Sequence, residues 1–460
     1  MLAAGPWAQA MFGAAALGDA RRSRRAVKVA EALATHPEQT LPKALERWAA
    51  LKAAYRLLAT PGVTHERLLA PHARATRAQC REAGHYVLPA DTTQLDFTTH
   101  RATGSLGRIG NDGGQGLMVH TTLALKLEEG ALDREDPPTR VVGLFDQQVW
   151  RRLEPPRKGR EKKARRLERP RESQVWARAL AAQTALPPGV HWTFVGDREA
   201  DLYELFAQRL PPGCDLVVRA SQPRALLQPQ GQSLWQTLEK AARLGEHTVA
   251  LRARPGAPAR CARLELRAHA VTLRPPWRPG RKLEPVSLWA VLAREREAPQ
   301  GAAPLDWLLL TTHACTSAEQ AERVLRLYGL RWLIEEYHKA LKSGTRIEQS
   351  QLGEAGRIEA LLGILGPLAT RLLDAKLLAR ARPEEPAAAA LCDGPTQKIL
   401  EKAVGRPATG WTNRALIRAI AQLGGFLGRR GDGEPGWQTI WRGWQVLHER
   451  LQGYLLALDG

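Results

Sequence analysis

Cysteine is scarce in this sequence of 460 residues, and long apolar runs are missing from it. The five cysteines are odd in number and scattered, and they form no CxxC pair and no cluster with histidine. This pattern argues against a structural zinc site and fits a reducing cytosol. No apolar run reaches the roughly 18 residues that a membrane span needs. We therefore expect no membrane segment.

The N-terminus also lacks the order of a secretory signal. A short apolar opening comes first and Arg21, Arg22, Arg24 and Arg25 follow it, whereas a signal peptide places its positive residues first. The sequence therefore predicts a cytoplasmic protein.

Acidic residues are outnumbered by basic ones. The chain has 67 Lys and Arg against 47 Asp and Glu, a formal net charge of +20. Such an excess favours a polyanionic partner, and DNA is the first candidate, which would associate the protein with the nucleoid. A GC-rich gene also enriches its product in arginine, so charge alone does not establish DNA binding.

The length allows two or three domains, and the residue pattern changes along the chain. Residues 1–75 contain Ala-rich amphipathic stretches and a breaker at Pro61-Gly62, which predicts a helical domain. Residues 76–350 mix strands and helices, and residues 351–460 are helical again. Two basic clusters in the first domain suit phosphate contacts: Arg21, Arg22, Arg24 and Arg25, then Lys52, Tyr55 and Arg56. For any one of these residues a solvated helix face is an equally good interpretation, and their clustering modestly favours phosphate contact.

Four apolar runs in the middle of the chain predict strands, at residues 86–88, 117–125, 141–150 and 191–195. With a helix near 172–185, they predict an α/β mixed sheet with helices on its faces. Asp91 follows the first run and Asp197 follows the last. Both are therefore expected at the C-terminal ends of strands, the edge where open α/β sheets bind ligands.

Residues 215–305 are rich in short β-type runs and predict a strand-rich insertion. A core strand follows at 307–310, and a long helix begins at Ser317, which forms a plausible capping box with Gln320. At 3.6 residues per turn, four polar residues of this helix fall within roughly a 60° arc. They are Tyr328, Arg331, Glu335 and Lys342. Such a stripe predicts a surface that faces phosphate or metal.

The carboxylates of Asp91, Asp197 and Glu335 would form an anionic cluster if Glu335 packs near the sheet edge. An unpaired cluster of this kind is repulsive and costly to bury. Because the ligands are all oxygen, Mg²⁺ or Mn²⁺ suits them best, with two ions for each site. Two such ions would activate a water or a 3′-hydroxyl for attack on phosphorus. For Asp91 alone, a turn or cap role is the simpler interpretation.

Two further segments allow more than one interpretation. Residues 151–171 are too charged for a core and predict either a mobile basic loop near nucleic acid or a solvated segment. Residues 356–372 predict an apolar helix face broken at Gly366-Pro367. Trp437, Trp441 and Trp444 recur at helical spacing, which favours core or dimer packing over ligand stacking.

Motifs along nearly the whole chain resemble the DDE class of cut-and-paste DNA transposases, in the insertion-sequence-four family that includes the transposon-five enzyme. The segment from Tyr328 to Lys342 is the most specific of these motifs. The others are Trp7-Ala8 with Phe12, Leu17-Gly18-Asp19 followed by Arg21-Arg22, Lys52-Ala53-Ala54-Tyr55-Arg56, Asp91-Thr92-Thr93, Gly196-Asp197-Arg198-Glu199-Ala200-Asp201, and Trp307-Leu308-Leu309-Leu310-Thr311.

The resemblance implies a ribonuclease-H-like core with a β-rich insertion, an N-terminal DNA-end-binding domain and a C-terminal dimerisation domain. Asp91, Asp197 and Glu335 would bind the metal ions. Tyr328, Arg331 and Lys342 would hold the DNA end, and Trp307 would lie near a flipped base, whose unstacking costs a few kcal/mol. Arg219 and Arg224 match weaker family positions near DNA. Thr60 and Val175 depart from the family pattern, and Val175 removes a possible phosphate contact.

With this resemblance, we expect a homodimeric transposase that binds terminal inverted repeats, cleaves DNA and joins the ends to target DNA. The step that forms a DNA hairpin is implied by the resemblance alone. One alternative is a structure-selective nuclease of the same fold. Another is a DNA-binding regulator descended from a transposase, which would not need all three carboxylates.

Overall fold

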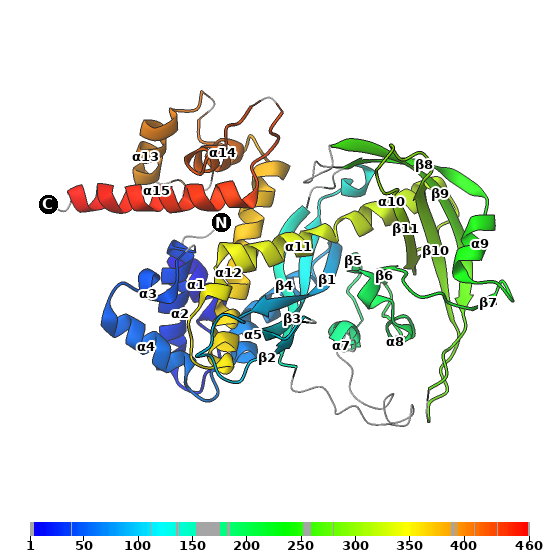
Figure 1. Ribbon diagram of the computed structural model, residues 1–460, viewed down its shortest axis with the longest axis horizontal. Coiled ribbons are helices and arrows are strands. Elements are labelled where there is room, and N and C mark those ends of the chain that lie inside the picture. The colour runs from blue at the N-terminus through cyan, green and yellow to red at the C-terminus, as the bar shows by residue number, and fades with distance from the viewer. Residues whose placement is uncertain are drawn as a thin grey trace.

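The computed structural model describes residues 4–37, 39–110, 112–134, 137, 139–152, 175–181, 185–251, 259–278, 280–387, 392, 394–408, 410–429 and 431–458. The basic segment predicted at 151–171 lies outside these residues except for Arg151 and Arg152. The described part of the chain combines one large mixed sheet with helical regions at both ends (Figure 1).

The N-terminal region is helical, as predicted. Its helices are α1 (Ala4–Phe12), α2 (Ala20–Thr35), α3 (Leu41–Ala44), α4 (Trp48–Leu58) and α5 (His65–Gln79). Asp19 caps α2 by accepting a hydrogen bond from the Arg21 amide, and Thr64 caps α5 by accepting one from the Arg67 amide. The predicted breaker is confirmed, because Gly62, at a φ of 85°, lies between α4 and α5.

Within the described residues, the sheet has eleven strands in the order β2-β3-β1-β5-β6-β11-β10-β9-β7, with β4 on β3 and β8 on β9. The strands are β1 (Gly84–Asp96), β2 (Gly107–Ile109), β3 (Gly114–Leu127), β4 (Thr139–Trp150), β5 (Val190–Gly196), β6 (Cys214–Arg219), β7 (Leu226–Gln228), β8 (Arg243–Leu251), β9 (Arg260–Leu273), β10 (Val286–Glu295) and β11 (Asp306–Thr311). The four predicted runs correspond to β1, β3, β4 and β5. The segment expected as an insertion extends the same sheet, because β6 pairs with β5, β11 pairs with β6, and β10 of the insertion pairs with β11.

Both faces of the sheet are covered by helices. Side chains alternate between the faces, so Val87 belongs to one core and its neighbours Tyr86 and Leu88 belong to the other. The first core includes the N-terminal helices and three later ones, α10 (Ala318–Gly329), α11 (Trp332–Lys339) and α12 (Ala355–Ala381). The second includes α7 (Val175–Ala181), α8 (Tyr203–Phe206) and α9 (Leu234–Lys240).

The position of Asp91 corrects one prediction. β1 runs parallel to β5 only as far as the pair Pro89–Val195, but it continues to Asp96 by antiparallel pairing with β3. Asp91 therefore lies inside β1, opposite Thr121, and not at the strand's C-terminal end. It lies just beyond the segment that pairs with β5. Asp197 directly follows β5, as predicted.

The predicted continuous helix from Ser317 through Lys342 is also wrong. The structure has α10 (Ala318–Gly329), a tight turn at Leu330 and Arg331, α11 (Trp332–Lys339) and one π-helical turn, η4 (Ala340–Gly344). The amides of Arg331 and Ile334 bond to carbonyls three residues back, which tightens the turn after the weak helix former Gly329. The ideal angles of the polar stripe therefore do not apply across it.

Of the two hydrogen bonds of the predicted capping box at Ser317, one forms. Ser317 accepts a hydrogen bond from the Gln320 amide at 3.3 Å. The Gln320 side chain, however, accepts bonds from the amide and hydroxyl of Thr316 instead of returning to the Ser317 amide. It therefore does not close a capping box.

The C-terminal region is helical, as predicted, with α12 (Ala355–Ala381), α13 (Gly394–Val404), α14 (Asn413–Leu423) and α15 (Trp437–Leu458). The expected break at Gly366-Pro367 does not occur, because α12 continues through Pro367. Residues on both sides of the proline are buried, so packing outweighs the loss of one backbone hydrogen bond. None of the helices in the described residues is both long and apolar enough to cross a membrane.

Candidate functional site

Asp91 and Asp197 lie close together, with Asp91 inside β1 and Asp197 directly after the neighbouring strand β5. The Asp91 carboxylate accepts a hydrogen bond from the Thr92 amide at 2.8 Å, and that of Asp197 accepts one from the Glu199 amide at 2.8 Å. Burial and the neighbouring charge of Asp197 raise the pKa of Asp91 to about 7. A raised carboxyl pKa beside a second carboxylate marks a place where positive charge would bind favourably.

Arg331 supplies positive charge at this place. Its Nη1 lies 3.5 Å from Oδ2 of Asp91, and its Nη2 donates a close hydrogen bond to Glu335, one turn along α11. The two carboxylates are neighbours, because they contact the same guanidinium, and the charge of Glu335 also contributes to raising the pKa of Asp91. The structure thus brings Asp91, Asp197 and Glu335 to one region, with Arg331 between two of them.

The geometry as it stands is not that of a closed metal site. Within the described residues, no group of three or more His, Cys, Asp or Glu side chains is placed closely enough to hold a metal ion. The donor set is nevertheless all oxygen, as Mg²⁺ or Mn²⁺ prefers. Withdrawal of the Arg331 guanidinium would leave Asp91 and Glu335 without their positive neighbour.

A buried histidine supports the strand that carries Asp91. His120 of β3 lies opposite Thr92, and its Nδ1 is hydrogen-bonded to the Thr92 hydroxyl at 2.9 Å. The His120 ring also meets Trp176 edge to face, with centroids 4.6 Å apart. Burial lowers the pKa of His120 to about 3, so the ring is neutral at ordinary pH. No pattern in the sequence indicated this contact.

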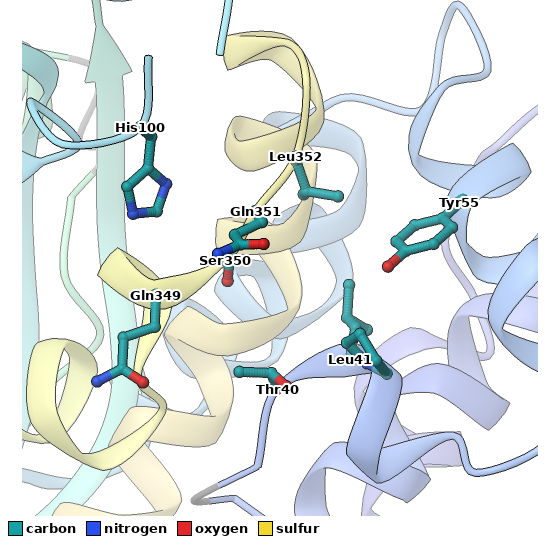
Figure 2. Close-up of a pocket in the computed structure, with 9 residues that line it drawn as sticks. Thr40, Leu41, Tyr55, His100, Gln349, Ser350, Gln351 and Leu352 are labelled. Atoms are coloured by element: carbon teal, nitrogen blue, oxygen red, sulfur yellow. The ribbon is translucent and has the colours of Figure 1, made fainter. Parts of the chain in front are cut away.

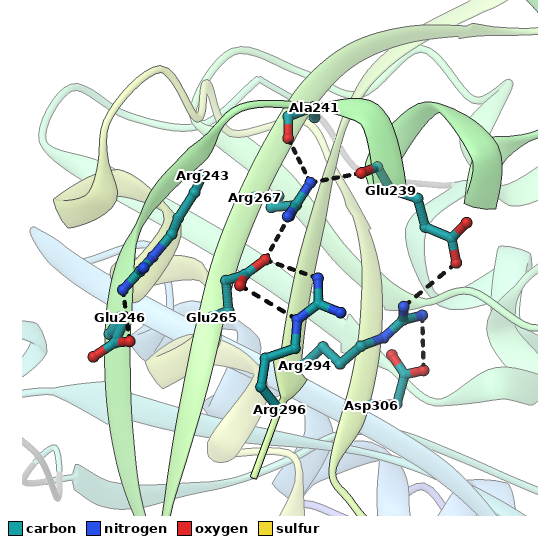
Figure 3. Close-up of polar contacts among 9 residues, drawn as sticks. All are labelled: Glu239, Ala241, Arg243, Glu246, Glu265, Arg267, Arg294, Arg296 and Asp306. Carbon is teal, nitrogen blue, oxygen red and sulfur yellow. Dashed lines mark hydrogen bonds and ion pairs between the residues drawn. The ribbon is translucent and has the colours of Figure 1, made fainter.

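Tyr328 and Trp307 form an aromatic pair near the carboxylates. Their rings meet edge to face at 5.7 Å, and burial raises the pKa of the Tyr328 hydroxyl. Arg219 donates a hydrogen bond to the Asp306 carbonyl at 3.1 Å, and its charge also acts on Tyr328. The Asp306 carboxylate is held by Arg294 at 3.1 Å (Figure 3). Trp307 therefore follows the first residue of β11, Asp306, which is held by both its carbonyl and its carboxylate.

Arg224 is engaged within the protein. Its guanidinium donates to the Asp201 carboxylate at 2.8 and 2.5 Å and to the Asp201 carbonyl at 2.8 Å. The same carboxylate accepts hydrogen bonds from the amides of Ser221 and Gln222, and it is fully buried. Arg224 thus fixes the loop after β6 through Nε and Nη2, and only the two N–H groups of Nη1 have no protein acceptor among these contacts.

Lys342 lies in the π-helical turn and is separated from the other residues of the predicted stripe by this change of helix type. Its Nζ is 3.9 Å from the Glu348 carboxylate. That carboxylate accepts a hydrogen bond from the amide of Asp96 at 2.9 Å. Lys342 is therefore close to the end of β1. A weak, partly exposed ion pair of this kind leaves the ammonium group accessible.

The N-terminal residues predicted to bind DNA are placed differently from one another. Arg21, Lys52 and Arg56 are at least partly exposed, whereas Arg22 donates a hydrogen bond to the Leu17 carbonyl at 3.0 Å. Tyr55 lines a pocket of about 520 Å³ between the N-terminal helices and residues 349–352 (Figure 2). Thr40 and Leu41 approach the pocket from the N-terminal side and His100 from the sheet side.

Glu336, the neighbour of Glu335, joins three helices. It accepts hydrogen bonds from Lys339 at 3.0 Å, from the Trp437 indole at 2.7 Å and, at close range, from Lys376. Lys376 also lies over the Trp437 ring, 4.3 Å from its centroid. The interpretation of Trp437 and Trp441 as packing residues fits the structure, because their rings stack at 5.3 Å. No pattern in the sequence indicated that Glu336 connects these helices.

Comparison with known families adds two matches. Residues 4–63 match a family model described as Transposase DNA-binding, and residues 365–457 match one described as Transposase Tn5 dimerisation domain. The first match contains Arg21, Arg22, Lys52, Tyr55 and Arg56, and the second contains Trp437, Trp441 and Trp444. Together they support a DNA-binding transposase that forms homodimers. The second description relates the chain more closely to the Tn5 type of transposase.

Proposed function

We propose that this protein is a divalent-metal-dependent transposase of the DDE class, in the insertion-sequence-four family. It binds terminal inverted repeats, cleaves DNA, forms a hairpin and transfers the ends to target DNA. One observation carries the proposal. Asp91, Asp197 and Glu335, which lie far apart in the sequence, converge in the part of the chain between the DNA-binding and dimerisation matches. A mixed sheet covered by helices on both faces supports a ribonuclease-H-like core.

The three carboxylates would hold one or two Mg²⁺ or Mn²⁺ ions. When bound, such ions activate a water or a 3′-hydroxyl and stabilise the leaving oxygen in an in-line displacement at phosphorus. The raised pKa of Asp91 supports this assignment, because a buried carboxyl beside a second carboxylate ionises more readily once positive charge is near.

The surrounding side chains would bind and orient the DNA. Arg331, which balances Asp91 and Glu335 in the free protein, would turn its guanidinium to a phosphate, where its planar fork can donate two hydrogen bonds. Trp307 and Tyr328 form a partly buried aromatic pair that suits an unstacked base. Lys342 would contact a phosphate near the end of β1. The N-terminal residues Arg21, Lys52 and Arg56 would bind the terminal repeat.

The test is a cleavage and joining assay. Purified protein is incubated with Mg²⁺ or Mn²⁺ and DNA that carries the inverted repeats flanking its own gene, with EDTA and with repeat-free DNA as controls. We expect metal-dependent cutting at the repeat end, a hairpin on the transposon side and joined products with a target plasmid. Cutting without joining, at branched DNA and regardless of repeats, would indicate the structure-selective nuclease instead.

A regulator that only binds DNA is the second candidate, and one observation favours it. As placed, the described carboxylates are not close enough for a metal ion, and Arg331 lies between two of them. Repeat binding that is equally tight in EDTA, with no cleavage in either metal, would support this function and contradict the transposase.

A further inference from the structure

The connection between β9 and β10 presents an exposed tryptophan. β9 and β10 pair up to Leu273 and Val286, and the hairpin that joins them projects beyond the sheet (Figure 1). Trp277 of this hairpin is 66% exposed, which makes it one of the most exposed large apolar side chains of the described residues. Its ring stacks on no other aromatic ring in the described part of the chain.

Positive residues lie on both sides of Trp277 along the hairpin. Arg274, Arg281 and Lys282 are exposed, and no carboxylate of the described residues forms a salt bridge with any of them. The acidic group nearest to them along the hairpin is Glu284, which is also exposed. We define these four residues, Arg274, Trp277, Arg281 and Lys282, as the hairpin surface.

The arginines on the neighbouring strands are paired differently. Arg267 and Arg296 both contact Glu265, at 2.6 and 3.0 Å, and Arg294 contacts Glu239 and Asp306 (Figure 3). On that part of the sheet the positive charge is largely balanced by carboxylates. The hairpin surface therefore differs from it by its unbalanced charge as well as by its aromatic ring.

The body of the protein holds the hairpin in place. Arg278 is paired with Glu204 of α8 at 2.6 Å, and the Tyr203 hydroxyl donates to the Glu284 carbonyl at 2.6 Å. Arg278 and Arg281 also pair across the tip as an isolated bridge. Pro275 and Pro276 restrict the backbone before Trp277. The side chain is thus presented on a supported loop, which lowers the entropy lost when a partner binds.

We propose that the hairpin surface is a sequence-independent binding site for DNA outside the terminal repeats. Cations without carboxylate partners match the charge of DNA phosphates, and an aromatic ring between them can lie against a deoxyribose or an unstacked base. The site is separate from the predicted catalytic region. It lies at the Val286 end of β10, whereas Trp307 pairs with Ala293 near the opposite end. The inference rests on the proposed function only in taking DNA as the partner.

Two variants of the full-length protein test this site, Trp277→Ala and the triple variant Arg274→Ala with Arg281→Ala and Lys282→Ala. A charge-matched control removes three exposed cations from the region of α13, namely Lys398, Lys402 and Arg406. Binding to a duplex without terminal repeats is measured by fluorescence anisotropy over a series of salt concentrations. Equal melting temperatures establish that the variants are folded.

We expect the triple variant to bind this duplex about tenfold more weakly than the control. The slope of log K against log salt should fall by about 0.9 for each phosphate that the variant no longer neutralises. Trp277→Ala should bind roughly fivefold more weakly or worse, and Trp277→Phe should recover most of that affinity. Affinities that match the control in both variants would overturn the proposal. So would a weakening confined to binding of anionic lipid vesicles.

The outcome is distinguishable from that of the proposed function. If the parent protein cuts no repeat DNA but the hairpin variants still lose repeat-free binding, the proposed function fails and the DNA site stands. If repeat cleavage is intact in the parent and the hairpin variants bind repeat-free duplex like the control, only the hairpin site fails.

Discussion

Arg331 and Asp91 face each other at the centre of the candidate site, with Nη1 of the arginine 3.5 Å from Oδ2 of the aspartate. The same guanidinium contacts Glu335 through its other nitrogen. Arg331 therefore provides, from within the chain, the positive charge that a bound cation would otherwise provide. A divalent ion at the proposed site would therefore compete with Arg331 for the same carboxylates.

Replacing Arg331 by Gln should make the protein depend more on metal ions for its stability. Without the cation, loss of the charged hydrogen bonds should cost about 1–2 kcal/mol. Addition of Mg²⁺ or Mn²⁺ should then raise the melting temperature of the variant more than that of the parent, because the ion no longer competes with the guanidinium. Arg331→Lys, which keeps the charge, is the control. Equal metal-induced shifts in parent and Arg331→Gln would rule out the competition.

Lys376 should make the stability of the protein rise with pH in the alkaline range. Burial lowers the pKa of Lys376 to about 8, against the opposing effect of Glu336, whereas an unfolded lysine titrates near 10.5. Between these values the unfolded chain binds more protons than the folded one, so the free energy of unfolding increases as pH rises from 8 to above 10. The increase should be on the order of 1–3 kcal/mol.

The measurement for Lys376 is urea unfolding at pH 8 and pH 10, for the parent and for Lys376→Met. Other lysines and tyrosines titrate in both proteins, so only the difference between them reports on Lys376. The methionine variant should gain less stability than the parent over this range. An identical pH dependence in the two proteins would show that Lys376 does not titrate as described.

Replacing Arg224 should lower the stability of the folded protein and should not selectively weaken DNA binding. Arg224→Ala leaves the buried carboxylate of Asp201 without its cation, and breaking a buried pair in this way costs about 3–5 kcal/mol. The measurement is thermal or urea unfolding. Arg219→Ala, which removes a hydrogen bond to the Asp306 carbonyl and a positive charge beside Tyr328 but leaves no carboxylate without its cation, serves as the comparison and should cost less. A stable Arg224→Ala protein with selectively weakened DNA binding would contradict this structural role.

Gly344 should tolerate no larger residue, because α15 packs directly on it. A Cβ at this position would enter the ring of Trp441, with two further ring atoms at 3.0 Å. Gly344→Ala should therefore destabilise the protein by about 1–3 kcal/mol. Gly356→Ala in α12 is the control, since its Cβ would meet nothing within 4 Å and alanine favours a helix by about 0.5–1 kcal/mol. Equal unfolding free energies for the two variants would mean that α15 does not pack on Gly344.

Local patterns in the sequence predicted much of the fold. Apolar runs located β1, β3, β4 and β5, and Asp197 was correctly placed after a strand, because a run followed by Gly-Asp marks a strand end directly. Asp91 was misplaced because β1 continues by pairing with β3, and such pairing depends on residues far away in the sequence. The turn at Leu330 and Arg331 was missed because the spacing of residues along a helix does not show where backbone amides bond to carbonyls three residues back instead of four.

The candidate site was predictable only in part. Glu335 and Arg331 could be found from their spacing. The ion pair between Arg224 and Asp201, in contrast, joins residues on different loops, and no periodic pattern connects them. The same holds for Glu336 and Trp437, whose hydrogen bond links helices about a hundred positions apart. The contacts of such residues can be identified only in the folded structure.

The most direct test of the proposed metal site is to separate DNA binding from cleavage in conservative variants of the three carboxylates. Asp91→Asn, Asp197→Asn and Glu335→Gln are compared with the parent for binding to repeat DNA and for cutting it in Mg²⁺ and Mn²⁺. We predict that each variant binds the repeat as tightly as the parent and cuts it at least about a hundredfold more slowly, as expected when a ligand of the reactive metal ions is removed (about 2.7 kcal/mol or more). Cutting at the parent's rate by any one of the three would contradict the shared metal site.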